Sequence, residues 1–181
     1  MREAFKYLAV LLVVMAASVG FVQLHEGKGY GLKTGQPAPG FRLPTLSGGE
    51  VDLAGLRGKI LVVNYWATSC PPCVEEMPSL DRLHQALAPE GLVVLGVSAD
   101  EDEAALRQFV EKHAIRFPVL RDPGGRVFGQ AYRTTGYPET FVVDRAGTLI
   151  ESYIGPAEWD TPGAIDHFRR LLKSLSTAPT R

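Results

Sequence analysis

The fold follows from one stretch of the chain, ILVVNYWATSCPPC at residues 60–73. Its first half, residues 60–66, is almost continuously apolar and β-rich, as in a strand buried on both faces. Two prolines follow the first cysteine, and such a pair is tolerated only in the first turn of a helix. Apolar residues then recur at helical spacing at Met77, Leu80, Leu83 and Leu87. The stretch predicts a central strand that leads directly into a helix.

The elements on either side complete an α/β pattern. Upstream, short apolar alternations over residues 41–53 are broken by Ser47-Gly48-Gly49, a β-hairpin signal. Downstream, apolar patterns predict strands at residues 92–97, 118–121, 140–143 and 149–154, and helices at 103–113, 127–132 and around 165–172. Strand, helix, strand implies a parallel crossover, and the turn at residues 144–147 implies an antiparallel hairpin beside it. The expected architecture is a central mixed β-sheet flanked by helices.

The length of 181 residues fits one globular domain with a short appendage. We expect a signal or transmembrane anchor at residues 1–24, a flexible linker at 25–39, the folded domain at 40–176 and a tail at 177–181. The linker prediction rests on glycines and prolines without apolar periodicity. With 19 basic and 20 acidic residues and no basic cluster, the chain lacks the electrostatic pattern of a nucleic-acid-binding protein.

The anchor prediction rests on the uncharged run of 18 residues from Tyr7 to Leu24. That length can just span a bilayer, whereas the apolar part of a cleavable secretory signal usually covers only about 7 to 15 residues. Ser18 and Gly20 fit the small positions of a cleavage site, so a removed signal is the alternative. Because such segments normally export the domain behind them, we expect a single-pass protein of the inner (cytoplasmic) membrane with its domain on the extracytoplasmic side.

The only two cysteines, Cys70 and Cys73, lie three positions apart at the predicted start of the helix. Residues at this spacing share one helix face about 5 to 6 Å apart, which suits a disulfide that opens and closes in place. The helix N-terminus favours a thiolate at the outer residue, Cys70. We therefore expect Cys70 to attack a partner disulfide and the more buried Cys73 to resolve the mixed disulfide.

Pro71 and Pro72 have no amide hydrogens, so two donors that would stabilise a Cys70 thiolate are missing. This favours a reductant, because stabilising the reduced form makes a cysteine pair oxidising. We expect the redox-active Cys70–Cys73 disulfide to act without any bound cofactor or metal. Zinc usually needs four ligands, and no second cysteine pair or histidine pattern supplies them. A structural disulfide is the other alternative.

With these residues in place, the chain resembles membrane-anchored thioredoxin-like oxidoreductases of the ResA, TlpA and CcmG type. The resemblance is carried by residues 63–73, by Glu76 and Pro78, and by GYPETF at residues 136–141. It implies a thioredoxin-like fold with an N-terminal β-hairpin extension and a protein-disulfide reductase acting outside the cytoplasm. The implied partners are a disulfide-containing protein, such as apocytochrome c in cytochrome c biogenesis, and a membrane-embedded thiol donor of the CcdA/DsbD type.

The resemblance also implies further site residues. Tyr137-Pro138 matches a cis-proline loop that faces the cysteines and pairs with an extended substrate segment. Trp66 is a second candidate substrate contact, with core packing as the alternative. Glu76 matches a glutamate that influences the thiols, since nearby negative charge raises a thiol pKa. The alternative for Glu76 is that it complements the helix N-terminus.

Several positions depart from the family pattern or have no assigned role. Asn64 replaces a buried acid of many cytoplasmic thioredoxins, and Ser69 replaces a common tryptophan, which changes the expected surroundings of Cys70. The acidic run at residues 100–103 is expected to cap a helix. Glu139 either touches substrates or lies in a solvated turn.

Other functions could use the same cysteines. An oxidase or isomerase would run the exchange in another direction, and a copper chaperone would use the sulfurs as soft ligands, usually with a further His or Met. Met77 is close in sequence. A peroxidase also occurs on this fold, but Thr68 lies only two residues before Cys70, unlike the threonine–cysteine spacing of peroxiredoxins.

Overall fold

The computed structural model describes residues 31–174, and all the elements below belong to the unit that begins at Lys33. The expected anchor at residues 1–24 and the expected tail at 177–181 lie outside the described residues. Within residues 31–174, none of the helices combines the length and the apolar character needed to cross a bilayer.

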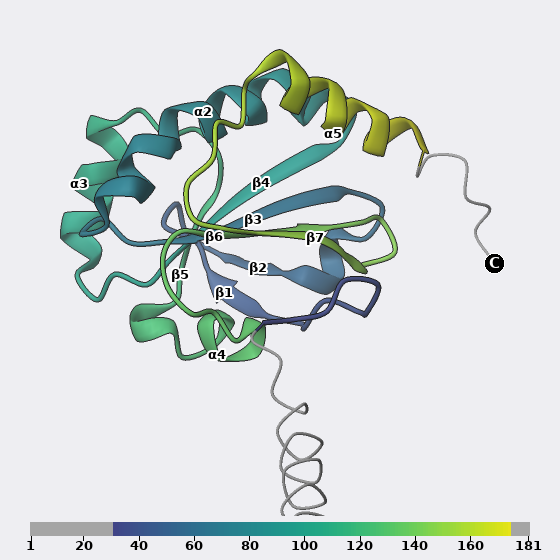
Figure 1. Cartoon of the computed structure of the whole chain (residues 1–181). Coiled ribbons are helices and arrows are strands. Elements are labelled where there is room, and N and C mark those ends of the chain that lie inside the picture. Colours follow the sequence, from purple (N-terminus) through teal and green to yellow (C-terminus); the bar gives the residue numbers. More distant parts are fainter. Residues whose placement is uncertain (1–30, 175–181) are drawn as a thin grey trace, which may run out of the picture. The chain divides into compact units, whose positions relative to one another are not determined.

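A five-stranded sheet in the order β5-β4-β3-β6-β7 forms the centre of the domain (Figure 1). The middle strand is β3 (Ile60–Trp66), as predicted, and all its residues are buried. β4 (Leu92–Ser98) pairs with it in parallel, and β5 (Val119–Arg121) pairs in parallel with β4. On the other side, β6 (Glu139–Val143) and β7 (Leu149–Ile154) are antiparallel. The predicted mixed sheet is confirmed.

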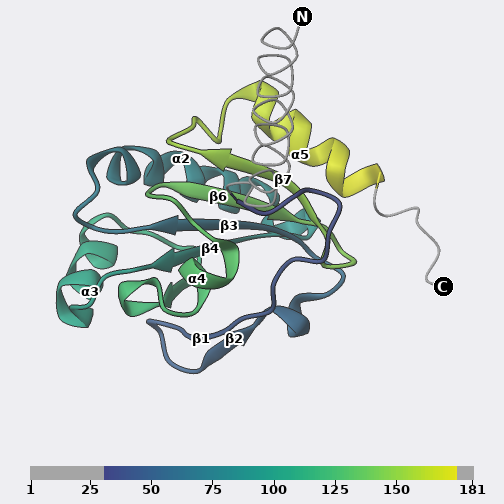
Figure 2. The ribbon, with the colours of Figure 1, turned by 60° about the horizontal axis from the view of Figure 1, so that its bottom comes forward.

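Helices cover both faces of this sheet (Figures 1 and 2). α2 (Pro71–Leu87), α3 (Glu103–Lys112) and α5 (Pro162–Ser174) share one face. α4 (Phe128–Tyr132) lies on the opposite side, together with the antiparallel hairpin of β1 (Arg42–Pro44) and β2 (Glu50–Asp52). Three short 3-10 helices connect these elements: η1 (Leu53–Leu56), η2 (Ala88–Glu90) and η3 (Pro123–Gly125). The expected N-terminal hairpin and thioredoxin-like architecture are therefore present.

The near-continuous apolar sequence of β3 is explained by packing on both of its faces. Ile60, Val62 and Trp66 join the buried cluster that includes α2 and α5. Tyr65 points the other way, and its ring centroid lies 5.5 Å from that of Phe128 in α4. Because successive side chains of a strand alternate between faces, a strand covered on both sides cannot carry the usual polar alternation.

The folded unit begins upstream of the boundary expected at Gly40. The Gly35 N–H donates to the Leu149 carbonyl at 2.8 Å, the Leu149 N–H returns a bond to Gln36 at 2.9 Å, and Pro37 bridges to Thr148. Part of the expected linker therefore lies against the start of β7. These contacts use backbone groups, so they leave no apolar periodicity in the sequence.

The packing of α2 generates a stability prediction. Leu80 is fully buried, whereas the isomeric Ile154 is 80% exposed. Leu80→Ala should lower the free energy of unfolding by about 2 to 5 kcal/mol, because it removes buried methyl groups and leaves a cavity. The matched control Ile154→Ala should change it by less than about 0.5 kcal/mol. Urea unfolding of both variants measures the difference, and equal losses would contradict the packing described here.

Candidate active site

The two cysteines lie where β3 gives way to α2. They form a disulfide, with their Cα atoms 5.3 Å apart, as their spacing predicts. Cys70 is half-buried, while Cys73 is completely buried. A partner molecule can therefore reach the sulfur of Cys70 and not that of Cys73.

Cys70 is also the N-cap residue of α2. Its sulfur accepts a hydrogen bond from the Cys73 N–H at 3.3 Å. An N-cap side chain normally accepts from the second or third helical amide, and here the second position is Pro72, which has none. The helix thus offers the Cys70 sulfur one amide donor. This limits the stabilisation that the helix N-terminus can give to a thiolate.

The loop before β6 borders the same strand end. Tyr137 and Pro138 are joined by a cis peptide bond, as the resemblance implies. The register that pairs Glu139 with Tyr65 puts Pro138 beside the end of β3, from which the chain continues to Cys70. Pro138 is buried, but Tyr137 is 43% exposed and its ring lies 4.9 Å from that of Tyr65. Tyr137 therefore offers an aromatic surface near the disulfide.

Glu76 points into the protein rather than toward the helix N-terminus. Only 3% of the residue is exposed. Its carboxylate accepts hydrogen bonds from Asn64 Nδ2 at 2.8 Å, from the Ala157 N–H at 3.1 Å and from Trp159 Nε1 at 3.0 Å. Burial raises the pKa of Glu76, and these three hydrogen bonds oppose that rise. A buried acid thus lies one helical turn after Cys73.

Asn64 connects this acid to the sheet. Its amide nitrogen donates to Glu76 and also to the Thr140 hydroxyl at 2.9 Å, so β3, α2 and β6 meet at one side chain. The strand position that holds an acid in many thioredoxins here holds a donor to an acid on α2. The sequence indicates only that Asn64 cannot titrate as an acid would at this position. No neighbouring residue predicts the hydrogen bond from Asn64 to Glu76.

Trp66 lies in the core, contrary to the expectation that it would be placed to contact a substrate. It has no exposed surface, and its ring lies 5.3 Å from that of Phe109 in α3. As the last residue of a central strand it faces the helices that cover the sheet, so its size serves the core. Packing, the alternative interpretation, is what the structure shows.

Two acids have roles that were not predicted from the sequence. Glu139 is buried, and its carboxylate accepts from the Thr135 N–H at 3.0 Å and the Thr135 hydroxyl at 2.6 Å, which shapes the loop that carries Tyr137 and Pro138. The acidic run at residues 100–103 caps α3 as predicted, through Asp102. The Asp100 carboxylate instead accepts hydrogen bonds from Thr68 in the turn before Cys70. For the contact of Glu139, the available sequence signal was Thr135, four residues earlier in the chain.

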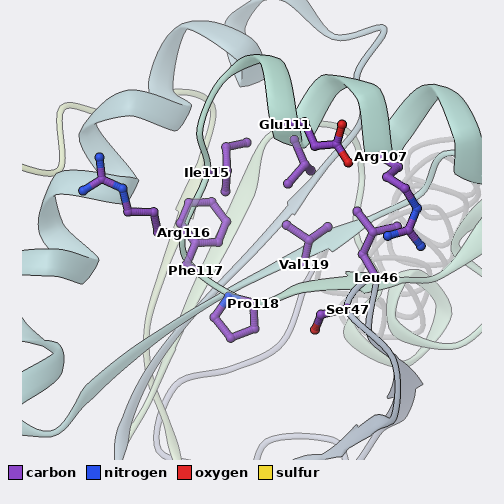
Figure 3. Close-up of a pocket in the computed structure, with 10 residues that line it drawn as sticks. Leu46, Ser47, Arg107, Glu111, Ile115, Arg116, Phe117, Pro118 and Val119 are labelled. Carbon is purple, nitrogen blue, oxygen red and sulfur yellow. The ribbon is translucent and has the colours of Figure 1, made fainter.

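A separate pocket of about 300 Å³ lies between α3, β5 and the β1–β2 turn (Figure 3). Its apolar lining includes Val110, Ile115, Phe117 and Val119, and Arg107 and Arg116 flank it. No lining residue belongs to the segments that surround the disulfide. Among residues 31–174 there is also no group of three or more His, Cys, Asp or Glu side chains arranged to hold a metal.

Comparisons with known proteins agree with this geometry. The AhpC/TSA family matches residues 34–152. The thiol-disulfide oxidoreductase ResA of Bacillus cereus is 32% identical over 157 residues, covering 85% of this chain and 90% of the relative. The thioredoxin-like protein YneN of Bacillus subtilis is 35% identical over 156 residues, covering 83% and 90%. A thiol:disulfide interchange protein of the thioredoxin family from Chlorobium tepidum has a TM-score of 0.64 at 28% identity, covering 80% and 97%.

The buried Glu76 predicts a pH-dependent stability. Because its folded pKa lies above the ordinary value of 4.5, the folded state holds the proton more tightly than the unfolded chain. Stability is then highest below that ordinary value and falls as pH rises through the raised folded pKa. In Glu76→Gln this fall should disappear, so the variant gains stability relative to the wild type as pH rises.

Urea unfolding at a series of pH values from roughly 4 to 8 measures this difference across the titration window. The neighbouring exposed Glu75→Gln serves as the control, and its curve should run parallel to the wild type. A constant gap between the Glu76→Gln and wild-type curves would show that burial of Glu76 does not shift its pKa.

Proposed function

Because the chain belongs to the AhpC/TSA family and is a thiol-disulfide oxidoreductase, we propose that it reduces disulfides of exported proteins through Cys70 and Cys73. One observation carries the proposal: a reachable Cys70 at the start of α2 is bonded to a buried Cys73, beside the Pro138 loop. The asymmetry of exposure supports unequal roles for the two sulfurs.

The exchange begins from the dithiol form. The Cys70 thiolate attacks one sulfur of the partner disulfide, forming a bond to it while the partner's other sulfur leaves as a thiolate. Cys73 then loses its proton and attacks the Cys70 sulfur, which releases the second partner thiolate. The partner gains two electrons and two protons in total, and the protein is left with the disulfide between Cys70 and Cys73.

The reducing direction is supported by the first turn of α2. Among the amides of this turn, only that of Cys73 donates to the Cys70 sulfur, because Pro71 and Pro72 have no N–H. A poorly stabilised thiolate leaves the dithiol form less favoured, and a pair of this kind gives up electrons readily. The opposite direction, oxidation or isomerisation, would require a well-stabilised thiolate.

Glu76 and Tyr137 receive supporting roles in this proposal. Glu76, buried one turn after Cys73, adds negative charge behind the thiols when ionised, and this charge opposes formation of a second anion at Cys73. Tyr137, which is 43% exposed and precedes the cis-proline beside the end of β3, offers aromatic surface that suits an extended protein segment.

The location and the partners extend the same proposal. The uncharged run from Tyr7 to Leu24 supports an anchor in the cytoplasmic membrane that leaves the domain on the extracytoplasmic side. In that compartment, electrons would come from a membrane-embedded thiol donor of the CcdA/DsbD type. The disulfide-containing substrate would be an exported protein such as apocytochrome c.

A trapping experiment tests the roles of the two sulfurs. In Cys73→Ser, Cys70 can attack a partner disulfide but nothing resolves the mixed disulfide, so the partner should remain covalently attached. The matched variant Cys70→Ser should capture no partner, because Cys73 is buried. Non-reducing electrophoresis and mass spectrometry of the full-length variants in their own host identify the adduct. Adducts on Cys70→Ser alone would reverse the assignment.

Restoring an amide tests the proposed direction. Pro72→Ala returns the second helical N–H, which should lower the pKa of the Cys70 thiol by about one pH unit, equivalent to about 1.4 kcal/mol. At a pH above the pKa of the Cys70 thiol, the reduction potential should rise by up to about 30 mV, starting from a wild-type value near that of thioredoxin, about −270 mV. The control is Pro71→Ala, because the first helical amide does not reach an N-cap side chain. A wild-type potential near −120 mV in glutathione titrations would make the protein an oxidant.

A further inference from the structure

The turn that carries Cys70 into α2 is held by a carboxylate from the neighbouring strand end. A hydrogen bond from the Cys70 N–H to the Ala67 carbonyl, 3.2 Å long, closes this turn. At its corner, the Thr68 N–H donates to both oxygens of Asp100, at 3.0 and 3.2 Å, and the Thr68 hydroxyl donates at 2.6 Å. The backbone N–H and the hydroxyl of Thr68 thus both donate to the same carboxylate.

Asp100 is itself fixed in place. The Ser98 hydroxyl donates to its carboxylate at 2.7 Å, and the Asp100 N–H donates to the same hydroxyl oxygen at 3.0 Å. β3 and β4 run parallel with Trp66 opposite Ser98, and the Ala99 N–H extends the pairing to the Trp66 carbonyl at 3.0 Å. The loops after β3 and β4 therefore start side by side at the C-terminal ends of these strands, and Asp100 links the two loops.

Among the four consecutive acids at residues 100–103, Asp100 is the one that faces the turn. Asp102 caps α3, Glu103 pairs with Arg121 at 2.7 Å, and Glu101 lies 3.9 Å from Arg126. In the described part of the chain, Asp100 bonds only neutral donors. Hydrogen bonds to a carboxylate are roughly twice as strong as those between neutral groups, so this acid is suited to hold a loop.

We propose that Asp100 is a positioning residue for Cys70, acting through Thr68; the inference rests on the proposed role of Cys70 as the attacking sulfur. The Cys73 amide restrains the Cys70 sulfur from the α2 side, and the turn restrains it from the β3 side. Without Asp100, the turn loses its hydrogen bonds to the loop after β4. The Cys70 sulfur is then less well oriented to attack a partner disulfide. The negative charge of Asp100 also lies against Thr68, two residues before Cys70.

Four single variants of the full-length protein, together with the double variant Asp100→Ala/Thr68→Val, separate the effect of holding the turn from the effect of the charge. Asp100→Ala removes both, whereas Asp100→Asn keeps an oxygen that can accept from Thr68 and removes only the charge. Thr68→Val removes the hydroxyl bond and keeps the backbone bond. The matched control Glu101→Gln removes one charge from the same loop without touching the turn.

Two measurements on the reduced proteins report the effects. The first is the second-order rate of reaction with a small aromatic disulfide, and the second is the pH profile of Cys70 alkylation by iodoacetamide. The other carboxylates on the elements bordering Cys70 are Glu75, Glu76 and Asp81 on α2 and Glu139 on β6, and they are unchanged in every variant. Unfolding midpoints show whether each variant is folded.

We expect Asp100→Ala to slow the reaction about tenfold, because small misplacements of a reacting atom are costly. Thr68→Val should slow it less, and the double variant should be no slower than Asp100→Ala, since both changes break the same contact. Asp100→Asn should keep most of the rate and shift the alkylation midpoint to lower pH, because a nearby negative charge disfavours the thiolate. Glu101→Gln should match the wild type in both measurements.

The inference is overturned if Asp100→Ala behaves like Glu101→Gln in rate and pH profile, or if the Asp100→Ala and Thr68→Val effects simply add. Should Asp100→Ala fail to fold, an unchanged pH profile in Asp100→Asn together with an unchanged rate in Thr68→Val overturns it equally. A wild-type protein that fails to react with disulfides at all would instead refute the proposed function. The two failures are therefore distinguishable.

Discussion

Burial of β3 on both faces is the constraint on which the rest of the structure depends. A strand hydrogen-bonded on both sides and covered by helices on both faces has one position and one register, so its end at Trp66 is fixed. The cysteines follow within a few residues of that end. Their position therefore derives from a strand that is buried along its whole length, while Cys70 itself is half-buried.

Around this strand end, three carboxylates each hold a different loop. Glu76 binds the segment after β7 through Ala157 and Trp159, Glu139 binds the cis-proline loop through Thr135, and Asp100 binds the turn before Cys70. Loops carry backbone amides that no ladder satisfies, and a carboxylate with two oxygens can accept several of them. The surroundings of the disulfide are thus held by polar contacts, which leaves the cysteines free to change their covalent state.

The same arrangement makes the two sulfurs chemically unequal. Cys70 has solvent access and one helix amide, whereas Cys73 lies in the core with the buried Glu76 one turn further along α2. Burial raises the pKa of Glu76. In the proposed exchange, the difference in access suits Cys70 to attack a partner and Cys73 to resolve the mixed disulfide.

Periodicity and spacing in the sequence were sufficient to predict the central strand, the helix after it, the mixed sheet, the hairpin and the joined cysteines, because each is encoded by residues close together in the chain. Resemblance added the cis-proline loop. The tertiary structure alone decided the partners of Glu76, 12 and 81 residues away, the bond between Asp100 and Thr68 across 32 residues, and the burial of Trp66. The strand-like path of residues 35–38 also emerged only there. Such contacts depend on which loops the folded sheet brings together at the ends of neighbouring strands. A local pattern of side chains does not encode which loops these are.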